Sequence, residues 1–465
     1  MTQKFHPKQP KGDDIESAIG AYAAGFDLGT VPEDIRRRAK LVLLDTVGVS
    51  IYGSSTDYIG TAVDTGTEMG LFGDGRSTVF ATGDGGSVLA ATVANAAGAT
   101  TLELDEGNQR SGHMGVHTVP PAVAVAESVG ATGTELLEAL VLSYEISARV
   151  GDLNRPLSGS LHPHGLWAAF GAAVAAGALH GFDADEYANA CRIAANPLLG
   201  THWAAAMEGA TVRNFYTGMT CQHGLTAAML AASGVSGMNS SLRRHLLSRT
   251  AKTELETEDV AARFATLEES YYLDGSYFKM HAACRYTHPP LDALEAMTET
   301  DPIDPESIDR IVVRSFESAG MLDGTRPHNR LGAKFSVPYA VAAKLCRGTS
   351  GVDAFEAGTR SDPSVRALAE RVEVVVDDEF ERRKAENDDW GAEVEIRFED
   401  GRKRSRTVLN ARGGGEKPFT EGEVRSKFRR LVGDVASEPV VTAIEERILG
   451  IEALEDATSL FAELR

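Results

Sequence analysis

Lysine is scarce in this sequence. Of the 46 Lys and Arg residues only 12 are lysine, and none of them lies between Lys40 and Lys252. The 67 Asp and Glu residues outnumber the basic residues and give a formal net charge of −21. Contacts to nucleic-acid phosphates need clustered Arg and Lys, so this balance argues against a nucleic-acid-binding protein. An acidic, lysine-poor surface is typical of proteins that stay hydrated in concentrated salt, and we expect a halophilic source.

Long apolar runs and paired cysteines are missing as well. No segment holds about 18 apolar residues free of charges and frequent glycines, which argues against a membrane-spanning helix. The first residues, MTQKFHPKQPKGDD, contain no apolar core like that of a signal peptide. We therefore expect a cytoplasmic protein with a disordered tail over residues 1–14. The four cysteines lie far apart without a CxxC pair, which predicts reduced, buried thiols at Cys191, Cys221, Cys284 and Cys346.

Several catalytic signatures are absent. The sequence contains no GxxxxGKS/T, no GxSxG, no HExxH and no GxGxxG after a strand-like segment. The glycine cluster ATGDGG at 81–86 resembles a loop and has no supporting lysine. These absences argue against P-loop, α/β-hydrolase and dinucleotide-binding proteins. We expect neither a metal nor a cofactor.

The first half of the chain has helical periodicity. A length of 465 residues is typical of two or three domains. From Ile15 to Gly53 the apolar residues recur at helical spacing, with a helix start near Pro32. Small residues in GLWAAFGAAVAAGALHG would let helices approach closely. Residues 15–270 are therefore predicted to form a helical domain, with further helices over 88–100, 119–130, 134–150, 165–181, 184–196 and 221–233.

Strand-like segments appear in the second half. RIVVRSF at 310–316 and VEVVVDDEF at 372–380 are β-branched runs, and AEVEIRFEDGRKRSRTVLN alternates around an Asp-Gly turn like a hairpin. VPYAVAAKLCRG between them has the pattern of a helix. We predict an α+β domain over residues 275–410, and helices over 411–465 that return to the first domain. The fold class is therefore mainly α.

The segment 102–127 is the first candidate for chemistry. It places Asp105, Glu106, His113 and His117 in a glycine-rich loop before a helix that we expect to begin near Pro120. A helix N-terminus suits an anionic ligand, and a carboxylate with two imidazoles can act as general acid and base. The spacing of the two histidines would also fit a metal, but the absence of HExxH and of nearby cysteines argues against one. A solvated polar loop is the alternative.

Two further segments carry isolated polar groups. His162 and His164 precede the small-residue helix, whose dipole would lower their pKa values and favour neutral imidazole. Their alternative role is to cap the helix or to lie in the core. Arg213 lies in an otherwise uncharged stretch and is suited to hold a carboxylate, with a structural salt bridge as the alternative.

The predicted domain junction contains a cationic cluster. Lys279, His281, Arg285 and His288 lie within ten positions, so they could join an anion site between the domains, or form a solvated charged turn. Tyr339 begins a predicted helix and could present its hydroxyl to a ligand, or lie in the core. Imidazoles, a carboxylate and cations together suit proton transfer next to a substrate carboxylate.

Several segments, in this order, resemble the MmgE/PrpD family, which includes 2-methylcitrate dehydratase, cis-aconitate decarboxylase and iminodisuccinate epimerase. They are LLDTVGVSIYG, ANAAGATTLELDEGN, HTVPPAVAVAE, HPHGLWAAFGAA, VRNFYTGM, CRYTHPPLDA, KFSVPYAVAAKL and KFRRLVG. Each segment alone is weakly specific, but their order and spacing are specific. The resemblance implies a large helical domain made from both termini, a smaller α+β lid domain and a homodimer.

The resemblance also implies a site for small di- or tricarboxylates that needs no metal. Carried over residue by residue, its acidic position falls on Asp105, its histidines on His117 and His162, its lysine on Lys279 and its tyrosine on Tyr339. Where decarboxylase and dehydratase members read like KRLHAG, this chain reads RNFYTG. Arg213 thus replaces a lysine and Tyr216 a histidine. Arginine keeps the charge but does not readily release a proton.

We therefore predict a dehydratase-type lyase that acts on a hydroxy-polycarboxylate such as 2-methylcitrate. In this hypothesis His162 or His117 acts as base or acid, and Asp105 orients one of them. Arg213 and Lys279 hold carboxylates, and Arg285, His288 and Tyr339 are further candidate substrate-binding residues. An epimerase or other isomerase, a decarboxylase, and a non-catalytic carboxylate-binding homologue are the alternatives.

Overall fold

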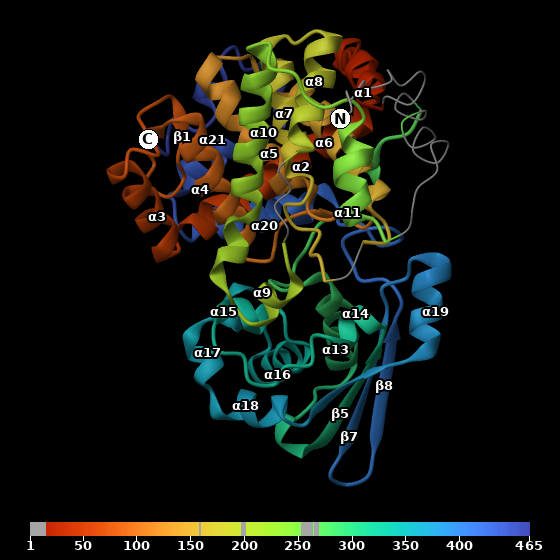
Figure 1. The fold of residues 1–465 in the computed structure, drawn as a ribbon. Coiled ribbons are helices and arrows are strands. Elements are labelled where there is room, and N and C mark those ends of the chain that lie inside the picture. Colours follow the sequence, from red (N-terminus) through yellow and green to blue (C-terminus); the bar gives the residue numbers. More distant parts are fainter. Residues whose placement is uncertain (1–14, 158–159, 197–200, 253–263, 265–268) are drawn as a thin grey trace.

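The computed structural model describes residues 15–465 except 158–159, 197–200, 253–263 and 265–268. The predicted tail over 1–14 and most of the acidic stretch before residue 270 lie outside the described residues. Helices dominate the rest, as expected for a mainly α protein, and they form an upper body and a lower body in Figure 1. No described helix combines the length and the apolar character that a membrane crossing requires.

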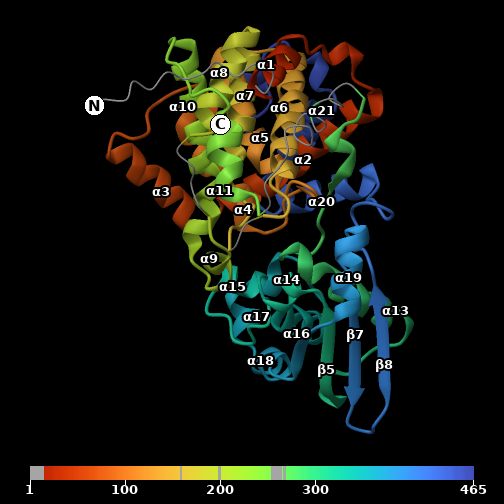
Figure 2. The ribbon, with the colours of Figure 1, turned by 45° about the vertical axis from the view of Figure 1, so that its right-hand side comes forward.

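The upper body is helical and contains segments from both ends of the chain. The C-terminal helices pack against α2, and both α1 and the C-terminus lie in this body (Figures 1 and 2). Its helices are α1 (Ile15–Ala24), α2 (Glu33–Ser54), α3 (Asp57–Glu68), α4 (Val88–Thr101), α5 (Met114–Val129), α6 (Gly133–Leu153), α7 (Ala168–His180), α8 (Ala184–Ala194), α9 (Trp203–Met207), α10 (Tyr216–Ala232), α11 (Ser248–Thr250), α20 (Glu421–Gly433) and α21 (Glu438–Leu449).

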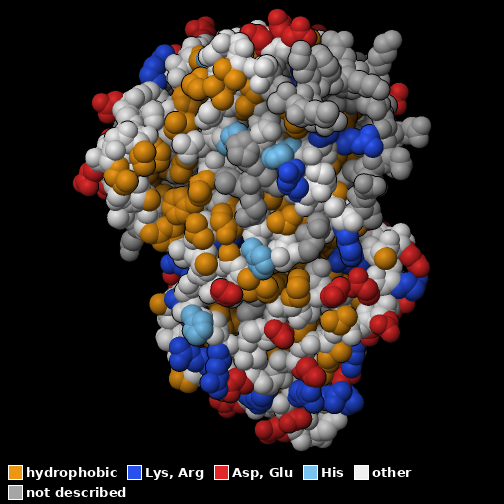
Figure 3. Space-filling model, viewed as in Figure 1, with side chains coloured by type: hydrophobic (Ala, Val, Ile, Leu, Met, Phe, Trp, Pro, Cys, Tyr) orange, Lys and Arg blue, Asp and Glu red, His pale blue; other side chains and the backbone are white. Residues whose placement is uncertain are grey.

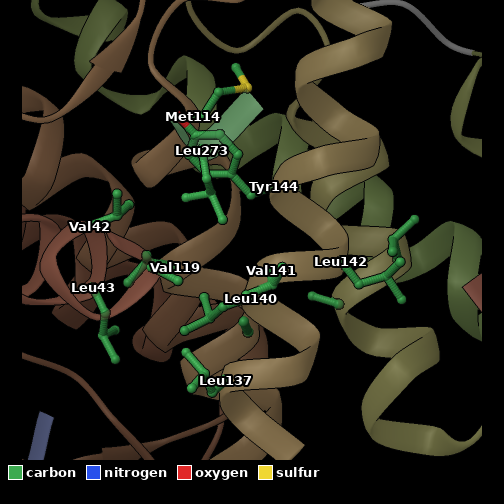
Figure 4. Close-up of a cluster of buried hydrophobic side chains, with 14 of the residues drawn as sticks. Val42, Leu43, Met114, Val119, Leu137, Leu140, Val141, Leu142, Tyr144 and Leu273 are labelled. Carbon is green, nitrogen blue, oxygen red and sulfur yellow. The ribbon is translucent and has the colours of Figure 1, made fainter. Parts of the chain in front are cut away.

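Close helix packing explains the small residues of this body. A Cβ atom on Gly53 of α2 would lie 2.0 Å from the carbonyl oxygen of Gly98 in α4, so only glycine permits this approach. A Cβ on Gly224 of α10 would likewise lie 2.2 Å from the carbonyl oxygen of Ala169 in α7. The large aliphatic side chains lie between α2, α5 and α6, where Val42, Val119 and Leu140 belong to one buried cluster (Figure 4).

The lower body contains a four-stranded sheet in the order β6-β5-β7-β8. Its strands are β5 (Ile308–Ser315), β6 (Val372–Val376), β7 (Ala392–Phe398) and β8 (Lys403–Val408), and its helices are α13 (His288–Thr300), α14 (Glu317–Gly320), α15 (Arg330–Lys334), α16 (Val337–Arg347), α17 (Ala357–Ser361), α18 (Pro363–Ala369) and α19 (Asp378–Asn387). β5 and β6 are parallel and are connected through α14 to α18, whereas the other pairs are antiparallel. Side chains alternate between buried and half-buried along β7, so one face of the sheet packs on the helices.

Two short strand pairs lie outside this sheet. β1 (Ser77–Thr78) pairs with β2 (Gly85–Gly86), and β3 (Gly107–Asn108) pairs with β4 (Ser276–Tyr277). The pairing of β3 with β4 matters for function, because it joins the segment after α4 to the segment that leads into the lower body. Candidate residues from 102–117 and from 277–288 are thereby brought together.

Four predicted element bounds are wrong. The helix expected over 119–130 begins at Met114, so His117 lies on its first turn rather than in a loop. The helix expected from residue 165 begins at Ala168, and the strand expected over 372–380 ends at Val376, where α19 follows. The helix expected over 221–233 begins at Tyr216. All four cysteines are unpaired; three are buried as predicted, whereas Cys346 is half-buried.

Prolines inside α5 explain the first error. Pro120 and Pro121 lack the N–H that a helix interior uses, which made them look like a helix start. Pro121 leaves the carbonyl oxygen of His117 without its helical donor. The thiol of Cys221 in α10 lies 3.5 Å from that oxygen and donates to it. The neighbouring helix therefore supports the proline-containing turn that carries His117.

Candidate active site

The segment Leu102–Glu106 connects α4 to β3 and lies where the two bodies meet. Leu102 and Leu104 belong to the buried cluster of the lower body, together with Ala283 and Phe335. Between them, Glu103 adopts a left-handed conformation with φ +52°, which is strained for a residue with a side chain. The carboxylates of Glu103, Asp105 and Glu106 are all buried.

Asp105 and His113 form the closest acid–imidazole pair of the site. Asp105 Oδ2 lies 2.7 Å from Nδ1 of His113, the residue that precedes α5. Lys279 Nζ lies 3.6 Å from the other oxygen, Asp105 Oδ1. Burial alone would raise the pKa of Asp105, but the His113 ring and the Lys279 ammonium hold that pKa below its usual range. Asp105 is therefore a carboxylate, and it orients the His113 ring with Nδ1–H toward itself and Nε2 free of that bond.

Three further histidines pack around this pair. The His164 ring centroid lies 4.7 Å from that of His113, 5.8 Å from that of His162 and 6.2 Å from that of His117. Burial lowers the pKa of His117 to about 3, and it lowers the pKa values of His162 and His164 well below the usual range. These imidazoles are neutral at neutral pH. The helix dipole is not the cause, because α7 begins four residues after His164.

Backbone hydrogen bonds fix the tautomers of two rings. His117 Nε2 accepts the N–H of Gly165 at 3.1 Å, so its proton lies on Nδ1. His162 Nδ1 accepts the N–H of His164 at 3.1 Å, so its proton lies on Nε2. Both rings are thus hydrogen-bond donors at their remaining nitrogen. Neither has its lone pair available as a base.

Arg213 lies in the turn before α10 and is fully buried. Its Nη1 forms an ion pair with Glu103, and its guanidinium carbon lies 5.2 Å from the ring centroid of Phe335. Its Nε and Nη2 atoms have no hydrogen-bond partner among the described residues. One edge of the guanidinium therefore contacts Glu103, while the Nε/Nη2 edge is available for a second carboxylate.

Lys279 follows β4 and contacts the same carboxylates. Its ammonium lies 3.6 Å from Glu103 Oε2 and donates to the carbonyl oxygen of Glu103 at 3.2 Å. Glu103, Asp105, Arg213 and Lys279 therefore form one buried network of alternating charge. No residue of this network or of the four histidines is more than 9% exposed, so the site is nearly closed to solvent in this structure.

The other predicted substrate-binding residues contact different groups. Arg285 donates to the carbonyl oxygens of Ala411 and Arg412, and its Nη1 lies 3.3 Å from His288 Nδ1. The Tyr339 hydroxyl donates to the carbonyl oxygen of Ala354 at 2.6 Å, within the lower body. The structure thus brings together Asp105, His117, His162, Arg213 and Lys279. It shows Arg285, His288 and Tyr339 engaged outside this group.

Sequence reasoning missed two members of the network. Glu103 was not singled out, because nothing in a sequence indicates a left-handed glutamate that faces a buried arginine. His113 was recognised as titratable, but His117 was chosen for the site. The observed helix start at Met114 distinguishes the two: His113 lies immediately before the helix and can contact the preceding loop, whereas His117 lies on the first turn. The expected start near Pro120 gave no such distinction.

One group outside this network could offer three metal ligands among the described residues. The ligand atoms of His281, Asp292 and Glu295 lie within 4.8 Å of one another. His281 Nε2 lies 2.9 Å from Asp292 Oδ1, and Lys344 Nζ lies 3.1 Å from Glu295 Oε1. Because these atoms already contact protein partners, we interpret the group as an ion-pair network of the lower body.

The upper and lower bodies together enclose imidazoles, carboxylates and two cations. Such a set of groups defines an acid–base site for an anionic ligand. Two family models match the chain: the MmgE/PrpD N-terminal domain over residues 17–245 and the MmgE/PrpD C-terminal domain over residues 281–451. The chain belongs to the MmgE/PrpD family, as the sequence resemblance indicated.

Similar curated proteins match over nearly their whole length. The cis-aconitate decarboxylase of Aspergillus terreus is 24% identical over 96% of this chain and 95% of that protein. The cis-aconitate decarboxylase-like protein oryM of Aspergillus oryzae is 26% identical over 97% of each chain. The cis-aconitate decarboxylase of Mus musculus is 22% identical over 96% of this chain and 92% of that protein.

Proposed function

We propose that the protein is a lyase that transfers a proton at a carbon atom next to a carboxylate of a small di- or tricarboxylate. One observation carries this proposal: buried polar atoms converge without partners. Asp105 Oδ1, His117 Nδ1, both ring nitrogens of His164, and Nε and Nη2 of Arg213 have no hydrogen-bond partner among the described residues. Buried polar atoms are normally satisfied, so a bound polar ligand is the natural partner for this set.

The cations explain why the ligand would be a carboxylate. The Nε/Nη2 edge of Arg213 matches a carboxylate in bidentate geometry. Lys279 adds a second positive charge beside the same network. Loss of a proton next to a carboxylate gives an enolate-like anion, and these two cations would stabilise that charge in a water-excluded site.

Dehydration is the first candidate reaction, and the imidazoles could carry it out. His113 Nε2, with its ring oriented by Asp105, would take the proton from the α-carbon, and the C–H electron pair would form the C=C bond as the β-carbon–oxygen bond breaks. The leaving hydroxide would take that proton back from His113 and depart as water. The N–H groups of His117 and His162 would hydrogen-bond the developing negative charge. The base is thus His113 rather than the two histidines that the sequence favoured.

Decarboxylation is the second candidate, and the comparisons favour it because curated relatives are named cis-aconitate decarboxylases. In that reaction the bond to a carboxylate carbon breaks, carbon dioxide leaves and its electron pair remains as an enolate-like anion. A protonated His113 would then supply the proton to carbon. Epimerisation would need the same base and cations, with the proton returned to the opposite face.

A substrate screen distinguishes these reactions. The protein would be incubated in heavy water with citrate, 2-methylcitrate or cis-aconitate, and followed by proton NMR. We expect one compound to lose or gain water, and the Asp105→Asn variant to be much slower. Release of carbon dioxide, or inversion without a change of composition, would assign the second candidate or an epimerase. No change with any di- or tricarboxylate would indicate a binding protein and contradict the proposal.

We also propose that the protein is a homodimer, as the family resemblance implies. Figure 3 shows hydrophobic side chains gathered over the face formed by α3, α4 and α10. An apolar groove of about 660 Å³ on this face is lined by Ile59, Phe72, Val93 and Phe215, and Met69 beside it is 69% exposed. Exposed apolar patches often mark protein interfaces. Sedimentation equilibrium should give twice the chain mass, and a monomer at micromolar concentration would contradict the proposal.

A further inference from the structure

Three consecutive backbone carbonyls of the site each accept a hydrogen bond from a different buried lysine. Lys334 Nζ donates to the carbonyl oxygen of Leu102 at 2.6 Å, Lys279 Nζ to that of Glu103 at 3.2 Å, and Lys427 Nζ to that of Leu104 at 2.5 Å. We call these three lysines, with the segment Leu102–Leu104, the lysine clamp. Three of the few lysines in the chain therefore converge on three residues.

The clamp joins elements that are distant in sequence. Lys334 is the last residue of α15 in the lower body, Lys279 follows β4, and Lys427 lies in α20 of the upper body. All three side chains are at most 2% exposed. The backbone that carries Glu103 and Asp105 is thus held simultaneously by both bodies and by the segment that connects them.

The charges of the clamp are compensated unequally. Lys279 lies near Glu103 and Asp105, and Lys427 Nζ forms an ion pair with Asp45 at 2.6 Å. Lys334 has no carboxylate within ion-pair distance among the described residues; its second hydrogen bond goes to the carbonyl oxygen of Ala282 at 3.2 Å. Burial lowers the pKa of Lys334 to about 7. Its ammonium also lies 5.0 Å from the ring centroid of Phe355. A buried ammonium held by carbonyls and a ring, without a counter-ion, is costly, and a methionine would fill similar space without that cost.

The clamped segment is also the strained one. Glu103 keeps φ +52° with its side chain on Arg213. Without the ammonium groups on the flanking carbonyls, the two neighbouring peptide units could rotate and let Glu103 relax to an extended conformation. That rotation would move Glu103 away from Arg213 and move Asp105 relative to His113. A displacement of about 1 Å at a catalytic group is enough to slow a reaction on the order of 100-fold.

We propose that Lys334 and Lys427 are positioning residues of the active site, which act through the carbonyls of Leu102 and Leu104 to hold Asp105 against His113. Neither lysine touches the reacting atoms in this account. The kinetic part of the test rests on the proposed function, whereas the spectroscopic part does not.

The test uses Lys334→Met, with Lys344→Met as the matched control. Lys344 is a mostly buried lysine of α16 that pairs with Glu295 in the lower body, away from the site. We expect Lys334→Met to lower kcat on the order of 100-fold while KM changes little, because substrate-binding groups remain. We expect Lys344→Met to leave both unchanged. Melting temperatures would show that both variants are folded.

The second readout is the ring Nδ1–H resonance of His113 in the full-length protein, assigned by its loss in His113→Gln. The hydrogen bond to Asp105 slows exchange of this proton and shifts it downfield. We expect the resonance to move or broaden in Lys334→Met and to stay in Lys344→Met. Lys427→Met would leave Asp45 buried without a partner, so it is tested together with Asp45→Asn, with the same expected result.

An unchanged His113 resonance in both Lys334→Met and the Lys427→Met/Asp45→Asn variant would overturn the proposal. A normal kcat in both variants would overturn it as well. If the unaltered protein turns over no carboxylate, the proposed function fails, and the His113 resonance alone still decides whether the clamp positions Asp105.

Discussion

Asp105 and His113 are joined by a 2.7 Å contact between Oδ2 and Nδ1, inside a site whose other three histidines are neutral. The contact leaves His113 Nε2 as the ring nitrogen suited to accept a proton. The backbone N–H groups of Gly165 and His164 already occupy the lone pairs of His117 and His162. The geometry therefore separates one base from two donors among residues that look equivalent in the sequence.

The first prediction concerns this pair. Asp105→Asn should lower kcat on the order of 1,000-fold or more, because an amide in place of the carboxylate favours the wrong tautomer of the neighbouring imidazole. The matched control is Asp292→Asn, which alters the 2.9 Å Asp292–His281 contact in the lower body. Initial rates on the substrate found by NMR measure both variants. Equal losses in the two variants would show that the effect is not specific to the site.

The second prediction concerns the buried pair Arg213–Glu103. Arg213→Met should destabilise the fold by about 3 kcal/mol, because it leaves the Glu103 carboxylate buried without its closest counter-ion. Arg213→Met/Glu103→Gln should recover most of that stability. Urea denaturation of the single and double variants gives the coupling free energy. Additive effects would mean that the two side chains do not stabilise each other.

The variant Arg213→Lys distinguishes the proposed role of Arg213 in binding a substrate carboxylate from its role in stabilising the buried Glu103. A lysine keeps the positive charge for Glu103 but lacks the Nε/Nη2 edge. We expect the variant to fold normally and to show a KM raised on the order of tenfold, with a smaller change in kcat. An unchanged KM would argue against a carboxylate on that edge.

The third prediction is a pH dependence of stability that arises at Glu106. Burial raises the pKa of Glu106 to about 8, although Tyr144 and the N–H of Gly115 donate to it. The folded protein therefore binds a proton that the unfolded chain releases near its ordinary pKa of 4.5. The contribution of Glu106 to the free energy of unfolding is therefore fully present below pH 4.5, and it decreases as the pH rises toward 8.

Glu106→Gln removes this titration. Its amide oxygen can accept the N–H of Gly115, and its amide N–H can donate to the Tyr144 hydroxyl, which reverses the direction of the present Tyr144 bond. The melting temperature of the variant relative to the unaltered protein should therefore be higher at pH 9 than at pH 5. Thermal denaturation in buffers across this range measures the difference. A constant difference between the two proteins would contradict the assigned pKa.

The fourth prediction concerns salt. Because the net charge is −21, the negatively charged side chains of the folded protein repel one another, and salt reduces that repulsion by screening. Exposed pairs such as Arg326–Glu370 contribute little at most, so their loss in salt is a small opposing effect. If the source is halophilic, the melting temperature should rise from about 0.1 M to molar KCl. A maximum in dilute buffer would contradict that expectation.

The sequence predicted the helical character well, because most helices have regular apolar spacing and clear breaks between them. It failed at α5, because Pro120 and Pro121 resemble a helix start, whereas they lie inside the helix and the thiol of Cys221 donates to a carbonyl that Pro121 leaves without its helical donor. The strand that was expected to reach residue 380 ends at Val376, because the acidic residues that follow begin α19.

The candidate site was predictable where a charge stood out locally. Arg213 lies in an uncharged stretch, and Asp105 and Lys279 lie in segments rich in titratable groups, and the structure brings all three together. The places of Glu103 and His113 in the site could not be predicted in this way. They depend on a left-handed backbone conformation and on where a helix begins, which a single sequence does not define. The clamp lysines Lys334 and Lys427 lie in helical segments and gave no sign that they would meet one short stretch of backbone.

In the proposed function His113, oriented by Asp105, moves a proton at a carbon next to a carboxylate. The most direct measurement is deuterium incorporation from heavy water at that carbon, followed by NMR. For a dehydratase it is made in the hydration direction, starting from the unsaturated acid, and for a decarboxylase in the product, because these are the directions in which the carbon gains a proton. We expect incorporation by the unaltered protein, none by His113→Ala, and normal incorporation by a control His281→Ala. Turnover without deuterium at that carbon, or undiminished incorporation by His113→Ala, would contradict it.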